Sequence, residues 1–329
     1  MRLFYALSGE HATLPRAEAF AALEAERVAV RSIAFGPSTL IVDAPRPPSR
    51  AWRRIALARY VGVVLASGGF DRIVAAARRL RMGTRSIRLR APAFAGEDRL
   101  AAERDLGGAL LAHGGRVNLE DPEVDFRLVG DGEFHLVRVL HTIDRTVFEK
   151  SHNERRTLGQ PVSLHPKFAR ALVNISRCPT GGRLLDPFCG TGGVLLEAAR
   201  IGAHALGGDL LPAMVERSRG TLGDLAGRAD LRTTDVASWS RLKPRVDAIA
   251  TDPPYGRSTT TAREDLESLY RRAFETFVQV LRPGGYAAMV LPSDEAVRLG
   301  EDFLELVEAH PLRVHRSLTR RFCAFRAPP

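Results

Sequence analysis

A glycine-rich turn between an apolar strand and a helix constrains this chain more than any other stretch. Segment 183–186 is an apolar strand candidate, the turn 187–193 contains three glycines, and segment 194–199 carries apolar residues at helical spacing. Glycines permit positive φ angles and let a ligand approach the backbone, while the first amides of a helix lack partners within it. We therefore expect a strand–turn–helix unit whose turn binds an anionic or hydrogen-bond-accepting ligand.

The residue before the turn distinguishes between the cofactors that such a turn can bind. Phosphate-binding turns avoid a carboxylate beside the pyrophosphate, whereas Asp186 immediately precedes this turn. A carboxylate there suits a cation, and S-adenosylmethionine combines an amino-acid ammonium group with a ribose and an adenine. Asp186 thus favours S-adenosylmethionine over NAD or ATP. A glycine-rich turn by itself is equally compatible with a tight connection between a strand and a helix.

Two further strand-end carboxylates outline a crevice together with Asp186. The apolar run 203–209 ends in Asp209, and the next strand candidate, 229–235, ends in Asp235. Ligands of open α/β sheets lie outside the carboxyl ends of the strands, where an acidic residue binds ribose hydroxyls. Asp209 fits that role, and Asp235 is placed to accept a hydrogen bond from an adenine amino group. Each carboxylate taken singly could instead be a helix N-cap or a solvated turn residue.

The fourth strand candidate, 246–251, leads into Asp252-Pro253-Pro254-Tyr255. Consecutive prolines have no amide hydrogens and a fixed φ angle, so the groups beside them are held rigidly. We expect Asp252 and the Pro253 carbonyl to accept the two hydrogens of a planar exocyclic amine, and Tyr255 to stack on the base. Because both hydrogens are held, the lone pair of the amine nitrogen points toward a methyl group. Positioning and electrostatics then supply most of the rate enhancement. The alternative is an ordinary proline turn that closes a strand.

These motifs carry a resemblance to a known family. Segment 186–193 together with Asp252-Pro253-Pro254-Tyr255-Gly256-Arg257-Ser258 resembles the amino-group methyltransferases with a Rossmann-like catalytic domain. More narrowly, the chain resembles the archaeal tRNA guanine-N2 dimethyltransferase family, whose members carry an RNA-binding THUMP domain ahead of the catalytic domain. Segment 7–10 resembles the opening of the family's N-terminal domain, and segment 117–129 resembles the end of a THUMP domain.

The resemblance implies a cofactor, a substrate and a set of site residues. S-adenosylmethionine is the implied cofactor and tRNA the implied partner, with methylation of the N2 amine of guanosine 10 giving N2-methyl- and N2,N2-dimethylguanosine. The implied catalytic residues are Asp252, Pro253, Pro254 and Tyr255, and the implied cofactor-binding residues are Asp186, Phe188, Cys189, Gly190, Thr191, Gly192, Asp209 and Asp235. Another tRNA or rRNA guanosine and a non-catalytic RNA-binding role remain as alternatives. DNA amino-methyltransferases share the tetrapeptide but lack a THUMP-like domain.

The expected fold class is α/β. We expect a C-terminal Rossmann-like methyltransferase sheet with an antiparallel edge hairpin, preceded by an α+β THUMP domain and a small N-terminal ferredoxin-like unit. The predicted boundaries are 1–48 for the ferredoxin-like domain, 49–143 for the THUMP domain, 144–161 for a linker and 162–329 for the methyltransferase domain. A proline-rich stretch after position 43 and a polar, aperiodic stretch from 144 to 161 motivate these divisions.

Composition indicates a polyanionic partner. The 329 residues include 48 lysines and arginines against 38 acidic residues, which gives a net charge of +10. Nearly all the basic side chains are arginine, which suits bidentate phosphate contacts but also reflects genome base bias. No apolar run approaches the roughly 20 residues that span a bilayer, and no signal peptide is recognisable, so we expect a cytoplasmic protein. Three scattered cysteines exclude a disulfide framework and a zinc site, no metal is implied, and no obligate protein partner is evident.

The densest basic patch lies in the predicted THUMP domain. Segment 86–90 alternates basic and apolar residues, as a half-exposed strand does, and more arginines precede it. Such a patch is either a solvated face or an RNA-contacting surface. The candidate RNA-binding residues are Arg78, Arg79, Arg81, Arg85 and Arg88, together with Arg257 beside the tetrapeptide.

Overall fold

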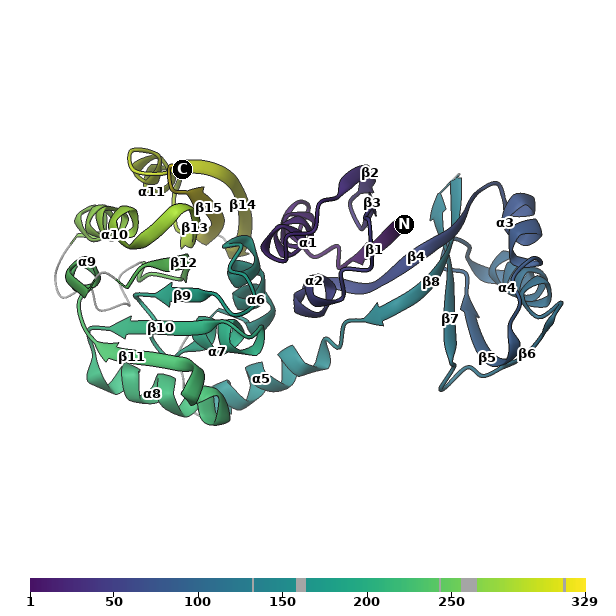
Figure 1. Ribbon diagram of the computed structural model, residues 1–329, viewed down its shortest axis with the longest axis horizontal. Coiled ribbons are helices and arrows are strands. Elements are labelled where there is room, and N and C mark those ends of the chain that lie inside the picture. Colours follow the sequence, from purple (N-terminus) through teal and green to yellow (C-terminus); the bar gives the residue numbers. More distant parts are fainter. Residues whose placement is uncertain (132, 158–163, 243, 256–264, 316–317) are drawn as a thin grey trace. The chain divides into compact units, whose positions relative to one another are not determined.

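The structure is a computed structural model that describes residues 1–131, 133–157, 164–242, 244–255, 265–315 and 318–329 (Figure 1). Contacts divide the chain into two compact units. The first unit comprises residues 1–7, 29–47 and 58–143, and the second comprises residues 8–28, 48–57 and 144–329. The functional division into four segments at 48, 143 and 161 stays a prediction.

The first unit is built on an eight-stranded mixed sheet. Its strands are β1 (Arg2–Leu7), β2 (Arg31–Gly36), β3 (Thr39–Asp43), β4 (Ala58–Gly68), β5 (Gly83–Arg90), β6 (Gly114–Val117), β7 (Val124–Asp131) and β8 (Glu133–Thr142). They lie in the order β2-β3-β1-β4-β8-β7-β5-β6, with β5 parallel to both of its neighbours. Helices α3 (Phe70–Ala77) and α4 (Gly96–Leu110) share an apolar core with β5, β7 and β8.

The second unit contains the predicted doubly wound sheet. Its strands are β9 (Arg183–Asp186), β10 (His204–Asp209), β11 (Ala229–Thr233), β12 (Val246–Thr251), β13 (Leu281–Leu291), β14 (Glu305–His315) and β15 (Leu318–Arg326). They lie in the order β11-β10-β9-β12-β13-β15-β14; the first five are parallel, and β15 runs antiparallel to β13 and β14. This arrangement confirms the predicted α/β class with its antiparallel edge hairpin.

The second unit contains nine helices among its described residues, and several of them bury the two faces of this sheet. They are α1 (Leu14–Ala25), α2 (Ser49–Arg54), α5 (Thr146–Thr157), α6 (Pro166–Ile175), α7 (Gly193–Arg200), α8 (Pro212–Leu222), α9 (Ser238–Leu242), α10 (Leu266–Val280) and α11 (Asp294–Glu301), with a 3-10 turn at Gly223–Arg228. Side chains alternate along a strand, so Ala248 and Ala250 of β12 join the core of α6 and α7, whereas Ile249 joins that of α10 and α11. The sheet is therefore a rigid support for the loops at its edge.

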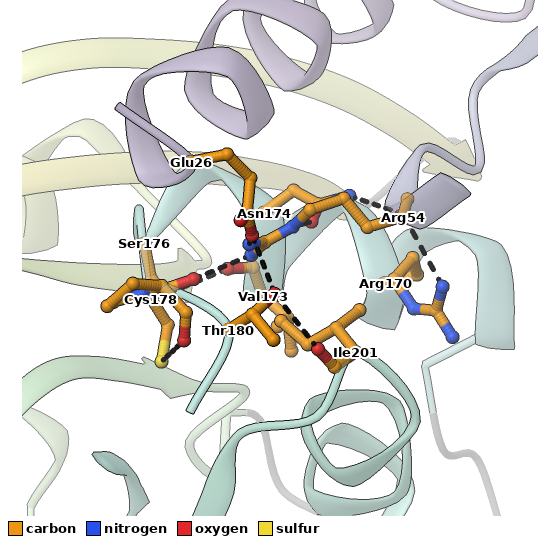
Figure 2. Close-up of polar contacts among 10 residues, drawn as sticks. Glu26, Arg54, Arg170, Val173, Asn174, Ser176, Cys178, Thr180 and Ile201 are labelled. Atoms are coloured by element: carbon orange, nitrogen blue, oxygen red, sulfur yellow. Dashed lines mark hydrogen bonds and ion pairs between the residues drawn. The ribbon is translucent and has the colours of Figure 1, made fainter. Parts of the chain in front are cut away.

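A buried polar network fastens α1 and α2 to α6 within the second unit (Figure 2). Asn174 of α6 donates from Nδ2 to Glu18 and to the Arg54 carbonyl, and it accepts from Arg54 Nε at 2.8 Å. Arg54 also donates to the Cys178 carbonyl at 2.7 Å and pairs with Glu26 at 2.8 Å. Since buried charges are stable only when paired and hydrogen-bonded, this closed network specifies how α6 packs.

Candidate active site

The four predicted carboxylates lie in series along one edge of the second unit's sheet. Asp186 and Asp209 are the last residues of β9 and β10, Asp252 directly follows β12, and Asp235 lies just beyond β11. These strands are parallel neighbours in the order β11-β10-β9-β12, so their carboxyl ends meet at the same edge. The structure thus brings together the residues that sequence analysis grouped.

Asp186 is enclosed and fully hydrogen-bonded at one oxygen. It is 1% exposed, and its Oδ1 accepts from the Thr251 hydroxyl at 2.6 Å and from the Phe188 amide at 3.2 Å. Burial raises the pKa of Asp186 to about 7, against the lowering effect of these hydrogen bonds, and the nearby Asp252 and Asp209 raise it further. A cation beside Asp186 would stabilise the ionised carboxylate and so offset the cost of burying its charge.

The glycine-rich turn has the backbone geometry that its sequence predicts. Gly190 and Gly192 have φ angles of 49° and 81°, and α7 begins directly after Gly192. The Gly190 amide donates to Asp209 Oδ2 at 3.0 Å, while the Gly190 carbonyl accepts from Ser218 Oγ at 2.9 Å. A Cβ atom on Gly192 would lie 2.9 Å from the Ser218 Cα, so only glycine fits there. Ser218 of α8 is a support that sequence analysis missed.

The remaining predicted residues of the turn are buried or partly buried. Cys189 and Thr191 are buried, and Phe188 packs against the core shared by α10 and α11. Burial raises the pKa of the Cys189 thiol well above its usual range, with Asp186 as a further cause. The thiol is therefore kept protonated, which argues against a nucleophilic role.

Asp235 has a strong partner that sequence analysis did not find. Arg272 of α10 donates from Nη1 and Nη2 to the two carboxylate oxygens at 2.8 and 3.2 Å. The Ala237 amide also donates to Oδ1 at 2.9 Å. Hydrogen bonds from Arg272 and the amide lower the pKa of Asp235 despite its partial burial, which raises it. Each carboxylate oxygen retains acceptor capacity for a ligand amine.

Asp252 differs from the other carboxylates because one of its oxygens is buried without a partner. Its Oδ1 has no hydrogen bond among the described residues, although the carboxylate is hydrogen-bonded to the Tyr255 side chain. Burial raises the pKa of Asp252 to about 6, and the charge of Arg320 and the Tyr255 hydrogen bond oppose this rise. An unpaired buried acceptor is costly in a native structure and marks a place where a donor belongs.

Aromatic and basic side chains from later elements hold the tetrapeptide. Tyr270 of α10 is 2% exposed and donates its hydroxyl hydrogen to the Pro254 carbonyl at 2.9 Å. The Arg320 guanidinium of β15 lies over the Tyr255 ring, with its Cζ 5.3 Å from the ring centroid. Neither Tyr270 nor Arg320 belongs to a local motif, so sequence analysis had no signal for them.

The predicted RNA-binding arginines fall into two groups. Arg78, Arg79 and Arg81 follow α3 and are exposed, as is Arg85 in β5. Arg88 is half-buried instead, and it pairs with Asp125 at 2.6 Å. The expected alternation along 86–90 is wrong, because Ser86 and Ile87 are both buried. Arg257 lies outside the described residues.

The described ranges contain no cluster of potential metal ligands, and none of the helices within them is long and apolar enough to cross a membrane.

Comparison with known proteins decides the family. A family model described as RMKL-like, methyltransferase domain, matches residues 153–321. The tRNA (guanine(10)-N2)-dimethyltransferase of Methanothermobacter thermautotrophicus is 34% identical over 330 residues, which cover 97% of this chain and 98% of that protein. The chain belongs to the tRNA (guanine(10)-N2)-dimethyltransferase family. It is therefore a methyltransferase, as the resemblance of its motifs implies.

A second relative supports this membership of the tRNA (guanine(10)-N2)-dimethyltransferase family, and a solved structure shows the same fold. The tRNA (guanine(10)-N2)-dimethyltransferase of Pyrococcus abyssi is 32% identical over 283 residues, covering 82% of this chain and 84% of that one. The crystal structure of TrmN from Thermus thermophilus superposes with a TM-score of 0.55 at 22% identity, covering 99% of this chain and 100% of TrmN. This last likeness establishes the shared fold.

Proposed function

We propose that this protein transfers methyl groups from S-adenosylmethionine to the exocyclic N2 amine of guanosine 10 in tRNA, giving N2-methyl- and N2,N2-dimethylguanosine. The names of the two archaeal relatives, which match most of this chain, support the substrate. The unpaired Asp252 Oδ1 is the observation that carries the proposal, since it is an acceptor prepared for an N–H donor at the carboxyl edge of the sheet.

The target amine fits the tetrapeptide. Asp252 Oδ1 accepts one amine hydrogen, the Pro253 carbonyl accepts the other, and the Tyr255 ring stacks on the base. Tyr270 holds the Pro254 carbonyl through its hydroxyl, so this part of the tetrapeptide is fixed before the base arrives. A guanine paired within tRNA has to leave its stack to reach this site. Hydrogen bonds to both amine hydrogens direct the nitrogen lone pair toward the transferable methyl group.

The cofactor fits the other carboxylates. Asp186 is suited to an ammonium group, because a cation relieves the cost of a buried carboxylate whose pKa is raised. The turn residues Phe188, Cys189, Gly190, Thr191 and Gly192 would surround the methionine portion, Asp209 would bind the ribose, and Asp235 would accept from the adenine amine. The bound cofactor supplies the electrophilic methyl group.

The first unit supplies the proposed RNA contacts. We propose that residues 49–143 form a THUMP domain, preceded by a ferredoxin-like domain at 1–48 and joined through 144–161 to the methyltransferase domain at 162–329. Exposed arginines at 78, 79, 81 and 85 are suited to bind phosphates. Arg88 is a weaker candidate because Asp125 already engages its guanidinium, and Arg257 is retained from its place beside the tetrapeptide. The cytoplasm is the expected site of action.

The experiment uses the purified chain alone with S-adenosylmethionine and unmodified tRNA transcripts, followed by nucleoside mass spectrometry. Wild-type protein is expected to form N2-methyl- and then N2,N2-dimethylguanosine, which would also show that no partner protein is required. The Asp252→Asn variant is the matched control, since it keeps the size of the side chain and removes its charge. Methyladenosine or methylcytidine as the product, or methylated guanosine at another position, would overturn the substrate assignment; no methylation in tRNA or rRNA would favour a binding role.

A further inference from the structure

Arg320 is a buried cation that the catalytic proposal leaves without a role. It lies in β15, which runs antiparallel to β13. The neighbouring residue Arg321 pairs with Leu291, the last residue of β13, so Arg320 lies just past the carboxyl end of β13. Thr251 of β12 pairs with Met289 of the same strand. Asp252 and Arg320 therefore reach the same edge of the sheet from opposite sides of β13.

Arg320 contacts the tetrapeptide in two ways. Its guanidinium lies over the Tyr255 ring and is also hydrogen-bonded to the Tyr255 side chain, which in turn is hydrogen-bonded to Asp252. The Arg320 side chain is 8% exposed, and its Nε has no partner among the described residues. A buried guanidinium is stable only beside negative charge or an aromatic face, and here Asp252 and Tyr255 supply both.

We infer that Arg320 is a positioning residue of the methyl-transfer site, which orients Tyr255 and keeps the Asp252 carboxylate charged so that it can accept the amine hydrogen of the target base. This inference rests on the proposed function for the identity of the base, but the placement of Arg320, Tyr255 and Asp252 does not depend on it. The residue acts through Tyr255 and Asp252, which are the groups that contact the base.

The other charged or titratable groups around Asp252 do not provide this compensation. Asp186 at the end of β9 is an acid and supplies no positive charge; the Asp252 charge is one of the causes that raise the pKa of Asp186. Tyr255 on the same loop and Tyr270 on α10 are neutral, because burial and the Asp252 charge raise the pKa of both phenols. Arg320 is the cation that lowers the pKa of Asp252 among the described residues. Its removal is expected to shift the Asp252 pKa upward.

The first test is a direct titration that needs no substrate. The carboxyl carbon of Asp252 is followed by NMR in protein with ¹³C-labelled aspartate, and its signal is assigned by its loss in Asp252→Asn. Arg320→Gln keeps a donor for Tyr255 but removes the charge, and the midpoint of the Asp252 titration is expected to rise by about one pH unit. In Arg320→Lys the midpoint should stay within about 0.3 pH unit of the wild-type value. Arg321→Met is the matched control, since Arg321 is bound to Asp294 instead at 2.6 Å.

The second test measures kcat against the affinity for S-adenosylmethionine. Arg320→Gln is expected to lower kcat at pH 7 by roughly tenfold, of which about twofold comes from the smaller ionised fraction of Asp252 and the rest from loss of the contact that orients Tyr255. The Kd for S-adenosylmethionine should change by less than about threefold, because Asp186, Asp209 and Asp235 are untouched. An unshifted Asp252 midpoint in Arg320→Gln, or a cofactor Kd that worsens as much as kcat falls, overturns the inference. If the glutamine variant does not fold, Arg320→Lys decides: a kcat lowered about threefold with an unshifted midpoint supports the inference, and a wild-type kcat overturns it.

Failure of this inference and failure of the proposed function have different signatures. The titration concerns Asp252 whichever nucleoside is methylated, and it remains measurable if no RNA is methylated. Methylation of a different base, with the Asp252 midpoint raised in Arg320→Gln, would overturn the substrate and leave the role of Arg320 intact. Guanosine methylation with an unshifted Asp252 midpoint in Arg320→Gln would overturn the role of Arg320 and leave the proposed substrate intact.

Discussion

Asp186 and Asp252 end neighbouring strands of one sheet, yet their surroundings differ. Asp186 is nearly inaccessible and accepts hydrogen bonds from Thr251 and the Phe188 amide, with acids as its charged neighbours. Asp252 has a cation beside it in Arg320 and keeps one oxygen unpaired. The first arrangement is suited to attract a permanent cation, and the second is suited to receive an N–H donor that comes and goes. Their different partners thus suit two carboxylates of similar position to different roles.

The largest expected effect comes from Asp252. Asp252→Asn is expected to lower kcat by roughly 10³-fold, since the amide cannot accept as strongly from the amine, while the Kd for S-adenosylmethionine changes by less than about threefold. Single-turnover methylation and calorimetry measure the two quantities. A variant whose affinity for S-adenosylmethionine falls as much as its kcat would assign Asp252 to the cofactor site instead.

Replacing Asp186 is expected to affect the binding of S-adenosylmethionine rather than the rate of methyl transfer. Asp186→Asn should weaken S-adenosylmethionine binding by roughly 10–100-fold, because an ammonium group loses its charged partner. Its stability at pH 8 should be equal to or above that of the wild type, since the folded state no longer holds a buried ionised carboxylate. Thermal unfolding at pH 8 checks the second statement. A large drop in melting temperature would show that the Asp186 charge is structural.

The raised pKa of Asp186 also predicts a pH dependence of cofactor binding. The carboxyl becomes neutral as the pH falls through about 7, so the affinity should fall by roughly tenfold per pH unit below that value. Binding near pH 7 should release a proton, which calorimetry detects in buffers of different ionisation enthalpy. The dependence should vanish in Asp186→Asn. A wild-type affinity that is constant between pH 5.5 and 8 would contradict the assignment.

Two glycines of the turn 187–193 are expected to differ in how strictly their backbone requires glycine. Gly192→Ala should destabilise the fold by about 2–4 kcal/mol, because its φ is positive and the new Cβ would meet Ser218 at 2.8 Å. Gly190→Ala should lower the free energy of unfolding by only about 1–2 kcal/mol. Its φ of 49° is strained for alanine, but no atom outside the adjacent residues lies within 4 Å of the position of the new Cβ. Chemical denaturation measures both. Equal effects would show that the contact with Ser218 does not constrain the turn.

The smallest expected effect concerns tRNA binding, which we assign to exposed arginines and not to Asp186 or Asp252. Replacing Arg78, Arg79 and Arg81 together by glutamine should raise the KM for tRNA by roughly tenfold at physiological salt and lessen its salt dependence, with kcat nearly unchanged. Arg104→Gln is the matched control, an exposed arginine of the same unit that already pairs with Asp105. An unchanged KM in the triple variant would assign the patch to a solvated face.

Much of the fold and family was predictable because the relevant signals are local. Parallel strands that each end in an aspartate indicate a crevice, and the motifs at 186–193 and 252–255 indicate the family and its cofactor. Residues such as Arg272 and Arg320 were not predictable, since each reaches its partner across the sheet edge from a distant element. Asn174 within an apolar helix could have signalled a buried network, but not that Glu18 and Arg54 complete it. The roles of the site residues themselves remain predictions.

The proposed contact between Asp252 and the N2 amine is tested most directly with a tRNA in which inosine replaces guanosine 10. Inosine keeps the ring and its carbonyl but lacks the N2 amine that Asp252 is proposed to bind. We expect N2-methyl- and N2,N2-dimethylguanosine in the guanosine 10 transcript and no methyl transfer to the inosine 10 transcript, as followed by nucleoside mass spectrometry. Equal methylation of both transcripts would contradict the proposed contact.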